Sequence, residues 1–277
     1  MPRVGILAGS GRFPLLLAGA AKASGWDVVV FAVEDEAYNP EFSKYSETIY
    51  RLKLGQIEKL IELLHKEKIN KAVMAGKVPK IKLFSDAQPD KRAIEIILKV
   101  KDQADDTLLG AVARELESEG INLLPSTFFL TALLASEGTL TNAGPTEKQW
   151  IDIRYGWRIA KEIGRLDIGQ TVVVKGASVM AVEAIEGTDE VIKRGGLLAK
   201  EGAVVVKVAK PQQDTRFDMP AVGVDTIESM KSVKAAVLAI EAGWTVLLDR
   251  DQTIAKANEA GIVMVACKNP PPEEGKR

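Results

Sequence analysis

The stretch Val4-Gly5-Ile6-Leu7-Ala8-Gly9-Ser10-Gly11-Arg12-Phe13-Pro14 decides the fold of the first half of the chain. Residues 4–8 are apolar and predict a buried strand, and the two glycines around Ser10 predict a tight turn. Residues 13–24 then have the Leu, Ala and Lys composition of a helix, and a second apolar run follows at residues 27–33. This alternation of strand, helix and strand favours a parallel sheet.

The same alternation continues along the chain, so we expect an α/β fold in both halves. Helical spacing at residues 56–68 leads into an apolar run at 72–75, and two amphipathic helical segments follow. Beyond residue 140, the strand-like segments are residues 171–174, 179–184, 203–209 and 246–248, and the helical segments are residues 148–163, 226–242 and 253–260.

A connection rich in Thr, Gly, Asn and Pro at residues 140–147 predicts two domains. A chain of 277 residues with 46% hydrophobic residues can bury two moderate cores. We place an N-terminal domain at residues 1–138 and a C-terminal domain at residues 139–268. Residues 269–277 carry too little apolar surface to offset the entropy of ordering, and we expect a mobile tail.

Composition argues against several classes of protein. The net charge of −1 and a pI near 6.1, without a basic stretch, argue against a nucleic-acid partner. Cys267 is the only cysteine, which excludes a disulfide framework and fits a reducing compartment. His65, the only histidine, lies among Lys and Glu and is expected at the surface, so a Ser-His-Asp relay has little support. Without an apolar run of about 18 residues or a signal peptide, we expect a cytoplasmic protein.

The glycine turn after the first strand lies where α/β proteins bind phosphate. Gly9, Ser10 and Gly11 let the backbone approach an anion, and the next helix offers its N-terminal amides. A dinucleotide fingerprint would have Gly at Pro14, which weakens an NAD interpretation although Glu34 lies about where a ribose-binding acid belongs. A turn whose glycines only avoid steric clash remains the alternative.

A second predicted strand end carries a lysine. Gly76-Lys77-Val78-Pro79 follows the apolar run at residues 72–75. Lys77 could meet an anion at that strand end, as the glycine turn could. An isolated lysine is also commonly a solvated surface residue, so both interpretations of Lys77 stay open.

Acidic side chains gather in the segment Glu183-Ala184-Ile185-Glu186-Gly187-Thr188-Asp189. Carboxylates placed together repel each other unless a cation or a proton neutralises them. Mg²⁺ takes oxygen ligands, commonly one or two carboxylates completed by waters and substrate phosphate. The segment therefore suits a magnesium ion. The alternative is a strand with exposed glutamates, followed by Thr188 or Asp189 as the cap of the next helix.

A loop between two prolines, Lys210-Pro211-Gln212-Gln213-Asp214-Thr215-Arg216-Phe217-Asp218-Met219-Pro220, alternates acids and bases. Arg216 can make the bidentate contact that a phosphate group offers. Asp214 or Asp218 can hold a metal or orient a water. A loop closed by Asp-Arg-Asp salt bridges is the alternative.

These segments together resemble the LpxI-type UDP-2,3-diacylglucosamine pyrophosphatases of lipid A synthesis. The matching blocks, in order over nearly the whole chain, are Ala8-Gly9-Ser10-Gly11-Arg12-Phe13-Pro14, Gly76-Lys77-Val78, Asp105-Asp106, Asp167-Ile168-Gly169-Gln170, and residues 183–189 and 210–220. The resemblance implies an N-terminal Rossmann-like parallel-sheet domain and a C-terminal α/β domain of less common topology. It also implies Mg²⁺-dependent hydrolysis of UDP-2,3-diacylglucosamine to UMP and 2,3-diacylglucosamine 1-phosphate (lipid X).

The resemblance carries roles to individual positions. The implied metal ligands are Glu183, Glu186, Asp189 and Asp214, the implied catalytic residues are Lys210, Asp214, Arg216 and Asp218, and the implied substrate contacts are Gly9, Ser10, Gly11, Lys77, Gln170 and Thr188. Asp225 ranks below these acids, because Val224 stands where we expect the family to have proline and because Asp225 could equally cap a helix.

The implied partners are the lipid nucleotide substrate, a second copy in a homodimer and the cytoplasmic face of the inner membrane, as a peripheral contact. Two other classes stay open. An NAD-dependent oxidoreductase would bind a dinucleotide tightly without metal, and a non-catalytic nucleotide-sugar sensor would bind ligand without turnover.

Overall fold

The computed structural model describes residues 1–33, 37–76, 89–100, 105–216 and 219–270. The chain forms two compact units. The N-terminal unit comprises Met1–Thr131 together with Asp214–Asp218, and the C-terminal unit comprises Ala132–Gln213 and Met219–Arg277. The chain passes from the first unit to the second between Thr131 and Ala132, whereas the sequence places the domain boundary after residue 138. A short piece of the second half of the chain belongs to the first unit.

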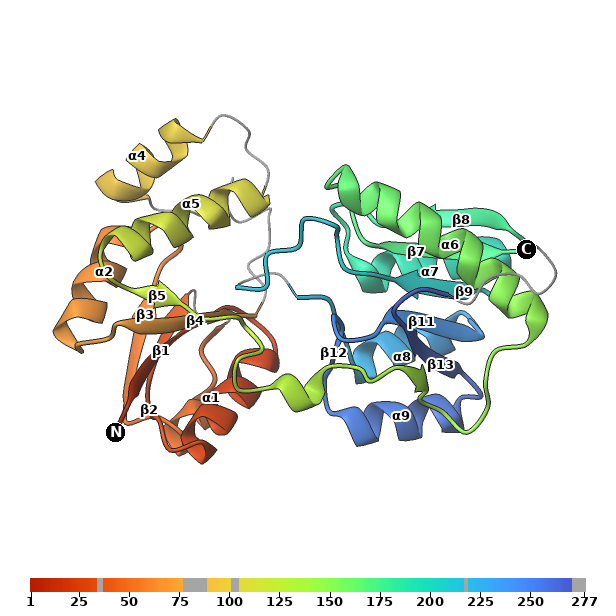
Figure 1. The fold of residues 1–277 in the computed structure, drawn as a ribbon, viewed down its shortest axis with the longest axis horizontal. Coiled ribbons are helices and arrows are strands. Elements are labelled where there is room, and N and C mark those ends of the chain that lie inside the picture. The colour runs from red at the N-terminus through yellow and green to blue at the C-terminus, as the bar shows by residue number, and fades with distance from the viewer. Residues whose placement is uncertain (34–36, 77–88, 101–104, 217–218, 271–277) are drawn as a thin grey trace. The chain divides into compact units, whose positions relative to one another are not determined.

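The N-terminal unit is built on a five-stranded parallel sheet with the strand order β3-β2-β1-β4-β5 (Figure 1). Its strands are β1 (Arg3–Ala8), β2 (Asp27–Val33), β3 (Thr48–Leu52), β4 (Lys71–Ala75) and β5 (Asn122–Leu123). The central strand β1 pairs on both sides, so that Ile6 lies opposite Val30 and Val73. The chain order reverses between β1 and β4, as it does in the Rossmann fold.

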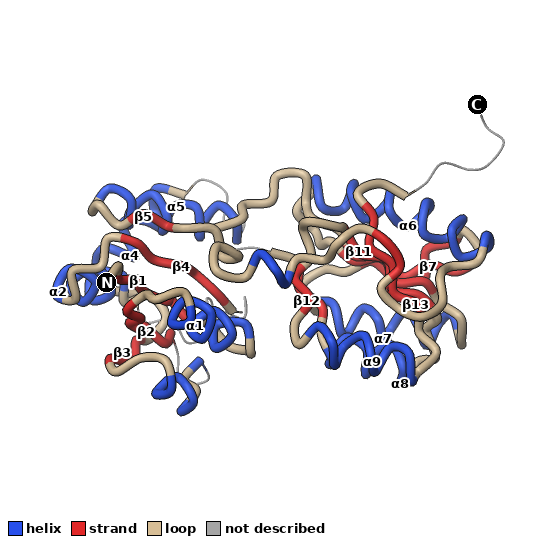
Figure 2. The backbone as a smooth tube through the Cα atoms, turned by 60° about the horizontal axis from the view of Figure 1, so that its bottom comes forward, coloured by secondary structure: helices blue, strands red, loops and turns tan. Residues whose placement is uncertain are grey.

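Helices cover both faces of this sheet. They are α1 (Phe13–Ala23), α2 (Ile57–Lys66), α4 (Lys91–Lys99) and α5 (Asp105–Ser118), with a 3-10 helix η2 (Pro40–Lys44). α2 and α5 pack against one face, where Leu64 and Leu116 share a core with Phe31. Figure 2 shows α1 on the opposite side of the sheet from α5. The alternating elements of the sequence therefore form three layers.

The C-terminal unit has a six-stranded mixed sheet with the order β6-β13-β11-β9-β7-β8. Its strands are β6 (Gly138–Thr139), β7 (Thr171–Lys175), β8 (Ser178–Val182), β9 (Val204–Lys207), β11 (Val237–Glu241) and β13 (Val263–Cys267). β9, β11 and β13 run parallel, whereas β6, β7 and β8 pair antiparallel to their neighbours. β10 (Ala221–Val222) and β12 (Val246–Leu247) form a separate parallel pair.

The helices of this unit also lie on two sides. They are α6 (Glu147–Arg165), α7 (Thr188–Ala199), α8 (Val224–Ser232) and α9 (Arg250–Glu259), preceded by a 3-10 helix η3 (Thr131–Leu133). α6 buries Ile153 and Trp157 in one core cluster, and α7 and α8 bury Ile192 and Ile227 in another. The two clusters correspond to the two faces of the sheet.

The single helix expected at residues 226–242 is wrong. α8 ends at Ser232, and Lys234 adopts a left-handed φ of 51° that interrupts helical geometry. The following apolar residues form strand β11, which pairs with β9 and β13 and is buried throughout. Burial between two parallel strands satisfies the backbone of this apolar run, so tertiary pairing overrides its helix-like spacing.

A side chain of α6 holds the turn between β7 and β8 in place. Gly176 and Ala177 have φ of 57° and 51°, the left-handed pair that a two-residue type I′ hairpin needs. Buried Asp152 on α6 accepts both of their backbone N–H groups, at 3.0 and 2.6 Å. These hydrogen bonds stabilise the left-handed conformation at Ala177, where a Cβ is unfavourable. The hairpin carries the acidic segment that follows β8.

Candidate functional site

Two glycine loops meet at the point where the strand order of the N-terminal sheet reverses. Gly9 follows β1 and donates its N–H to the carbonyl of Ala75 at 2.8 Å. Gly76 follows β4 with φ of 94°, and a Cβ built on it would lie 2.7 Å from the carbonyl carbon of Gly9. Only glycine fits at position 76, so the close approach of the two loops depends on this residue. Open α/β sheets bind ligands at this position.

The helix after the first loop presents its N-terminus to the same strand end. α1 begins at Phe13, and in the described structure its N-cap residue Arg12 makes no side-chain cap and its first turn contains no acid. The partial positive charge of the helix terminus is therefore not met by a carboxylate of its own first turn. Ser10 is half-buried and Gly11 is exposed, with φ of 100°. Lys77 and Glu34 lie outside the described residues.

The acidic segment of the C-terminal unit contains a buried carboxylate. Glu183, 6% exposed, accepts the hydroxyl of Thr188 at Oε1 (2.8 Å) and the N–H of Gln170 at Oε2 (3.1 Å). Lys207, 5% exposed, donates its ammonium to the same Thr188 hydroxyl oxygen at 2.8 Å. A Cβ on Gly169 would lie 2.2 Å from the carbonyl oxygen of Glu183, so this close approach requires glycine. One hydroxyl thus links a buried acid to a buried base.

This arrangement contradicts parts of the alternative to the metal interpretation of the segment. Because Glu183 is buried, the alternative of exposed strand glutamates is wrong for it. Helix capping by Thr188 or Asp189 is also wrong, because Gly187 occupies the N-cap position of α7. Glu186 instead pairs with Arg194, whose hydrogen bond holds the pKa of that carboxyl below its ordinary value.

Two side-chain oxygens of the predicted site residues have no donor in the described part of the chain. Asp189 Oδ1 and Gln170 Oε1 are buried and have no hydrogen-bond partner among the described residues. A buried oxygen without a donor is costly, and a hard cation is one partner that satisfies it. Within the described ranges, no three Asp, Glu, His or Cys side chains lie together as a ready metal cluster. Any metal held there takes part of its coordination from water or from a ligand.

The loop that follows β9 begins with an ion pair. Lys210 Nζ lies 2.6 Å from Asp167 Oδ1, and its backbone N–H donates to Gln213 Oε1 at 2.9 Å. The Lys210 side chain is nearly buried. Asp167 has a left-handed φ of 56° just after α6. The pair therefore joins the Asp167-Gln170 segment to the start of the proline-bounded loop.

The middle of that loop belongs to the N-terminal unit. Asp214 accepts a fork of hydrogen bonds from the Arg216 side chain, the shortest being 2.6 Å from Nη2 to Oδ2. Arg216 Nη1 also contacts Glu117 Oε1 on α5 at 2.7 Å, and the carbonyl of Thr215 accepts the N–H of Ser126. The Arg216 hydrogen bond holds the pKa of Asp214 below its ordinary value. Asp214 is therefore an anion at neutral pH.

The predicted site residues thus fall into three groups. Gly9, Ser10 and Gly11 lie at the strand end of the N-terminal sheet, and Asp214 and Arg216 belong to the same unit. Gln170 and Thr188 donate to the buried carboxylate of Glu183 in the C-terminal unit, and Asp189 follows Thr188 in α7. Glu186 and Lys210 are engaged in separate ion pairs. Asp218 lies outside the described residues.

Three residues that contact the predicted site residues were not themselves predicted as site residues. Lys207, Asp167 and Glu117 each contact a predicted site residue. Lys207 precedes the proline-bounded loop, which is the only sequence signal that marks it. Asp225 lies exposed in the first turn of α8, whose N-cap is Gly223, so it does not cap that helix.

The lone histidine and cysteine play no part in these groups. The His65 side chain is 51% exposed beside Glu119, which confirms the surface prediction. Cys267 is buried at the end of β13, and burial raises the pKa of its thiol to about 12. The thiol is therefore protonated and poorly reactive at neutral pH.

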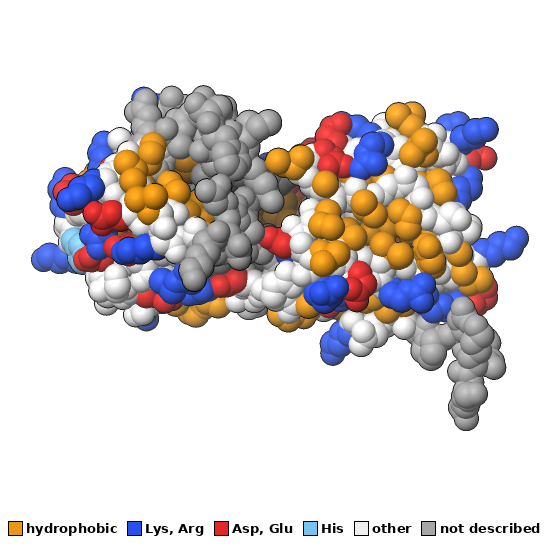
Figure 3. All heavy atoms as spheres, turned by 90° about the horizontal axis from the view of Figure 1, so that it is seen from above, with side chains coloured by type: hydrophobic (Ala, Val, Ile, Leu, Met, Phe, Trp, Pro, Cys, Tyr) orange, Lys and Arg blue, Asp and Glu red, His pale blue; other side chains and the backbone are white. Residues whose placement is uncertain are grey.

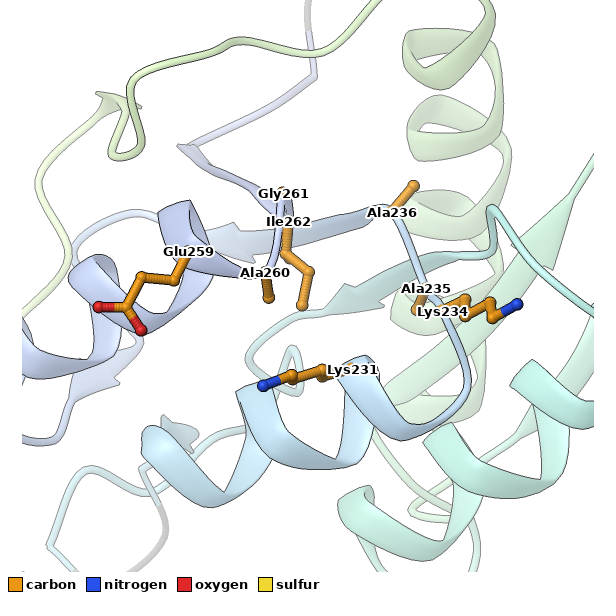
Figure 4. A pocket seen from close by; sticks show the side chains of 8 residues that line it. All are labelled: Lys231, Lys234, Ala235, Ala236, Glu259, Ala260, Gly261 and Ile262. Atoms are coloured by element: carbon orange, nitrogen blue, oxygen red, sulfur yellow. The ribbon is translucent and has the colours of Figure 1, made fainter.

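The C-terminal unit has a hollow at the amino ends of β11 and β13. Its lining includes Lys231, Lys234, Ala236, Glu259 and Ile262 (Figure 4). Ala236 and Ile262 directly precede β11 and β13, so the hollow opens at the amino ends of the parallel strands. It does not coincide with the groups described above.

On the face drawn in Figure 3, basic and acidic side chains are interspersed. In the part of the chain that the structure describes, no helix combines the length and the apolar character needed to cross a bilayer.

Comparisons with known proteins place the chain in a family. The model of the LpxI N-terminal domain matches residues 3–133, and the model of the LpxI C-terminal domain matches residues 136–265. The chain is 31% identical over 276 residues to UDP-2,3-diacylglucosamine pyrophosphatase LpxI of Caulobacter vibrioides, covering 96% of this chain and 97% of that protein. A solved biotin carboxylase domain of the Hydrogenobacter thermophilus 2-oxoglutarate carboxylase is 14% identical to this chain. The match covers 71% of this chain and 41% of that one with a TM-score of 0.27, which is too low to support a common fold. Through both of its domains, the chain belongs to the LpxI family.

Proposed function

We propose that this protein hydrolyses the diphosphate of UDP-2,3-diacylglucosamine to UMP and lipid X in lipid A biosynthesis. The observation that carries the proposal is the similarity, along 96% of the chain, to a protein named for that pyrophosphatase activity. To the groups described above the proposal assigns the three parts of that chemistry, namely anion binding, charge neutralisation and the orientation of water.

The glycine loops of the N-terminal unit are our choice for a phosphate contact of the substrate. Gly9 and Gly76 bring the backbone close together at the strand end, and α1 points its N-terminus there. Backbone amides and the helix dipole both favour an anion at such a terminus. Gly11 and Ser10 lie between strand and helix, and Lys77 follows Gly76 in the sequence.

Basic side chains neutralise the charge that develops on the diphosphate. In our proposal, Arg216 and Lys210 take this role, with Asp214 and Asp167 holding their charged ends in place. Asp214, kept anionic by Arg216, can also accept a hydrogen bond from an attacking water, a role it shares with Asp218. In our proposal Gln170 and Thr188, which both donate a hydrogen bond to Glu183, also contact the substrate.

Magnesium fits the oxygens of the Glu183 segment. Asp189 Oδ1 and Gln170 Oε1 are buried without donors, and Glu183 has lone pairs beyond those that its two hydrogen bonds use. We propose Asp189 and Glu183 as the principal ligands. Glu186 and Asp214 rank after them, because arginines already neutralise both. When bound, Mg²⁺ would polarise the phosphoryl oxygens and reduce the charge that a nucleophile must approach.

The proposed location follows from the substrate rather than from the fold. A diacylated nucleotide resides in or beside a membrane, so we propose that the protein acts in the cytoplasm, in peripheral contact with the inner membrane. We also propose a homodimer. Flotation with vesicles and light scattering of the purified protein test these two statements separately.

The test of the function is an incubation with UDP-2,3-diacylglucosamine in detergent micelles, with Mg²⁺ or with EDTA, followed by mass spectrometry. We expect equal release of UMP and lipid X with Mg²⁺ and none with EDTA. Asp189→Asn should raise the Mg²⁺ concentration that half-activates the enzyme, whereas Glu190→Gln, exposed on the same helix, should leave it unchanged. Intact substrate under both conditions would favour a sensor, and tight NAD binding would favour an oxidoreductase.

A further inference from the structure

An ion pair between a half-buried lysine and a buried glutamate holds the backbone of a single residue. Lys161 Nζ on α6 lies 2.8 and 2.7 Å from the two carboxylate oxygens of Glu241, at the end of β11. The same ammonium donates to the carbonyl of Ala209 at 2.9 Å, and Ala209 donates its N–H to Glu241 Oε2 at 2.7 Å. Both backbone polar groups of Ala209 are thus held by one acid and one base, an arrangement called here the Ala209 clamp.

The clamp lies directly before the proline-bounded loop. Ala209 precedes Lys210, and two further contacts tie the next residues to the end of α6. Lys210 Nζ pairs with Asp167, and the Gln212 side-chain amide donates to the carbonyl of Gly164 at 2.9 Å. A Cβ on Gly164 would lie 3.3 Å from Lys210 Cα, so the loop start packs tightly on α6. The clamp is the first of these contacts along the chain.

Stability alone is a weak reason for such a pair. Glu241 is 7% exposed and the Lys161 side chain is 30% exposed, so the desolvation of the carboxylate offsets part of their attraction. Replacing a buried ion pair with apolar side chains of similar size is often neutral or stabilising. A pair that directs its hydrogen bonds to one backbone residue does fix geometry, which apolar side chains do not.

We propose that Lys161 and Glu241 are positioning residues for the hydrolysis. They fix the point at which the chain leaves β9 and thereby place Lys210 for the diphosphate. This role rests on the proposed function, since it assigns Lys210 to the site. A displacement of about 1 Å in such a group can lower turnover on the order of 10²-fold.

The test separates geometry from stability. The double variant Lys161→Met/Glu241→Leu removes the clamp and keeps the side-chain volume. Because the N–H and the C=O of buried Ala209 then lose these partners, the urea midpoint of the variant should fall, and its kcat is measured at urea-free conditions where the protein is folded. Its kcat for UDP-2,3-diacylglucosamine should fall by about 10-fold to 10²-fold, with a smaller change in KM. Lys161→Arg keeps a cation that can reach both partners, and should recover part of the lost rate.

The matched control is Glu162→Gln, which breaks the exposed pair with Arg165 one position along α6. It should leave kcat unchanged. A folded double variant with kcat within about twofold of wild type overturns the positioning role while leaving the function intact. If the double variant does not fold, the kcat of Glu241→Gln is compared with that of the wild-type protein instead. Equal kcat values would then also overturn the positioning role. A wild-type protein that does not hydrolyse the substrate removes the proposed function, and this role with it.

Discussion

Replacing Thr188 with valine tests the network around Glu183 with the smallest change of shape. The substitution keeps the β-branched side chain and removes only the hydroxyl that joins Glu183 to Lys207, each at 2.8 Å. Oε1 of Glu183, a residue that is 6% exposed, then loses the hydroxyl donor, while Lys207 retains the carbonyl of Ala221. Buried carboxylate and ammonium groups depend on such partners.

The magnitude follows from these two bonds. A hydrogen bond to a charged group contributes about 1.5 to 3 kcal/mol. Two are lost, and the lysine keeps part of its coordination, so we expect a loss of about 3 kcal/mol in the free energy of unfolding of the C-terminal unit. The loss should appear as a lower urea midpoint with an unchanged m-value.

The control for this experiment is Thr188→Ser, which keeps the hydroxyl and removes only a methyl group. It should lose about 1 kcal/mol or less. A valine variant as stable as the serine variant would show that the hydroxyl does not support the buried charges, and the account of this network would then be wrong.

Three further outcomes follow from the structure. Asp152→Ala removes the acceptor of both amides in the β7–β8 turn and should lower stability by about 2 kcal/mol, measured by urea unfolding, with Glu147→Ala at the exposed start of α6 as the neutral comparison. The lowered pKa of Asp214 means that its contribution to stability is complete above its unfolded pKa near 4 and is lost as the pH falls through the folded value. Unfolding midpoints measured from pH 5 to 2.5 should therefore fall less steeply for Asp214→Asn than for the wild-type protein, and identical slopes would contradict the ion pair with Arg216. The raised pKa of Cys267 predicts no labelling by iodoacetamide at pH 8 in the folded protein and full labelling in urea, so rapid labelling of the folded protein would contradict its burial.

The sequence was sufficient where a local pattern had one structural solution. The apolar run before Gly9 and the run at residues 27–33 became neighbouring parallel strands, because buried strands joined by a helix have few other arrangements. It was insufficient at residues 226–242, where pairing with two strands overrode helical spacing. β13, Val263–Cys267, was not expected at all, since a short apolar run near a chain end resembles many other segments.

The candidate site was predicted as a set of residues but not as an arrangement. The glycines of both strand ends and the Glu183 segment could be selected from sequence, because their residue types match known chemistry. That Thr188 joins Glu183 to Lys207, or that Asp214 belongs to the N-terminal unit, depends on contacts between distant parts of the chain. No local pattern encodes such contacts. The Ala209 clamp was missed for the same reason, because Lys161 and Glu241 are 80 positions apart.

The most direct test of the central claim is hydrolysis of UDP-2,3-diacylglucosamine by the wild-type protein with Mg²⁺ in ¹⁸O-labelled water. We predict equal amounts of UMP and lipid X, with a single ¹⁸O on the phosphate of one product, which also identifies the phosphorus that water attacks. Release of UDP with the free diacylated sugar, or recovery of unlabelled intact substrate, would contradict the proposed diphosphate hydrolysis.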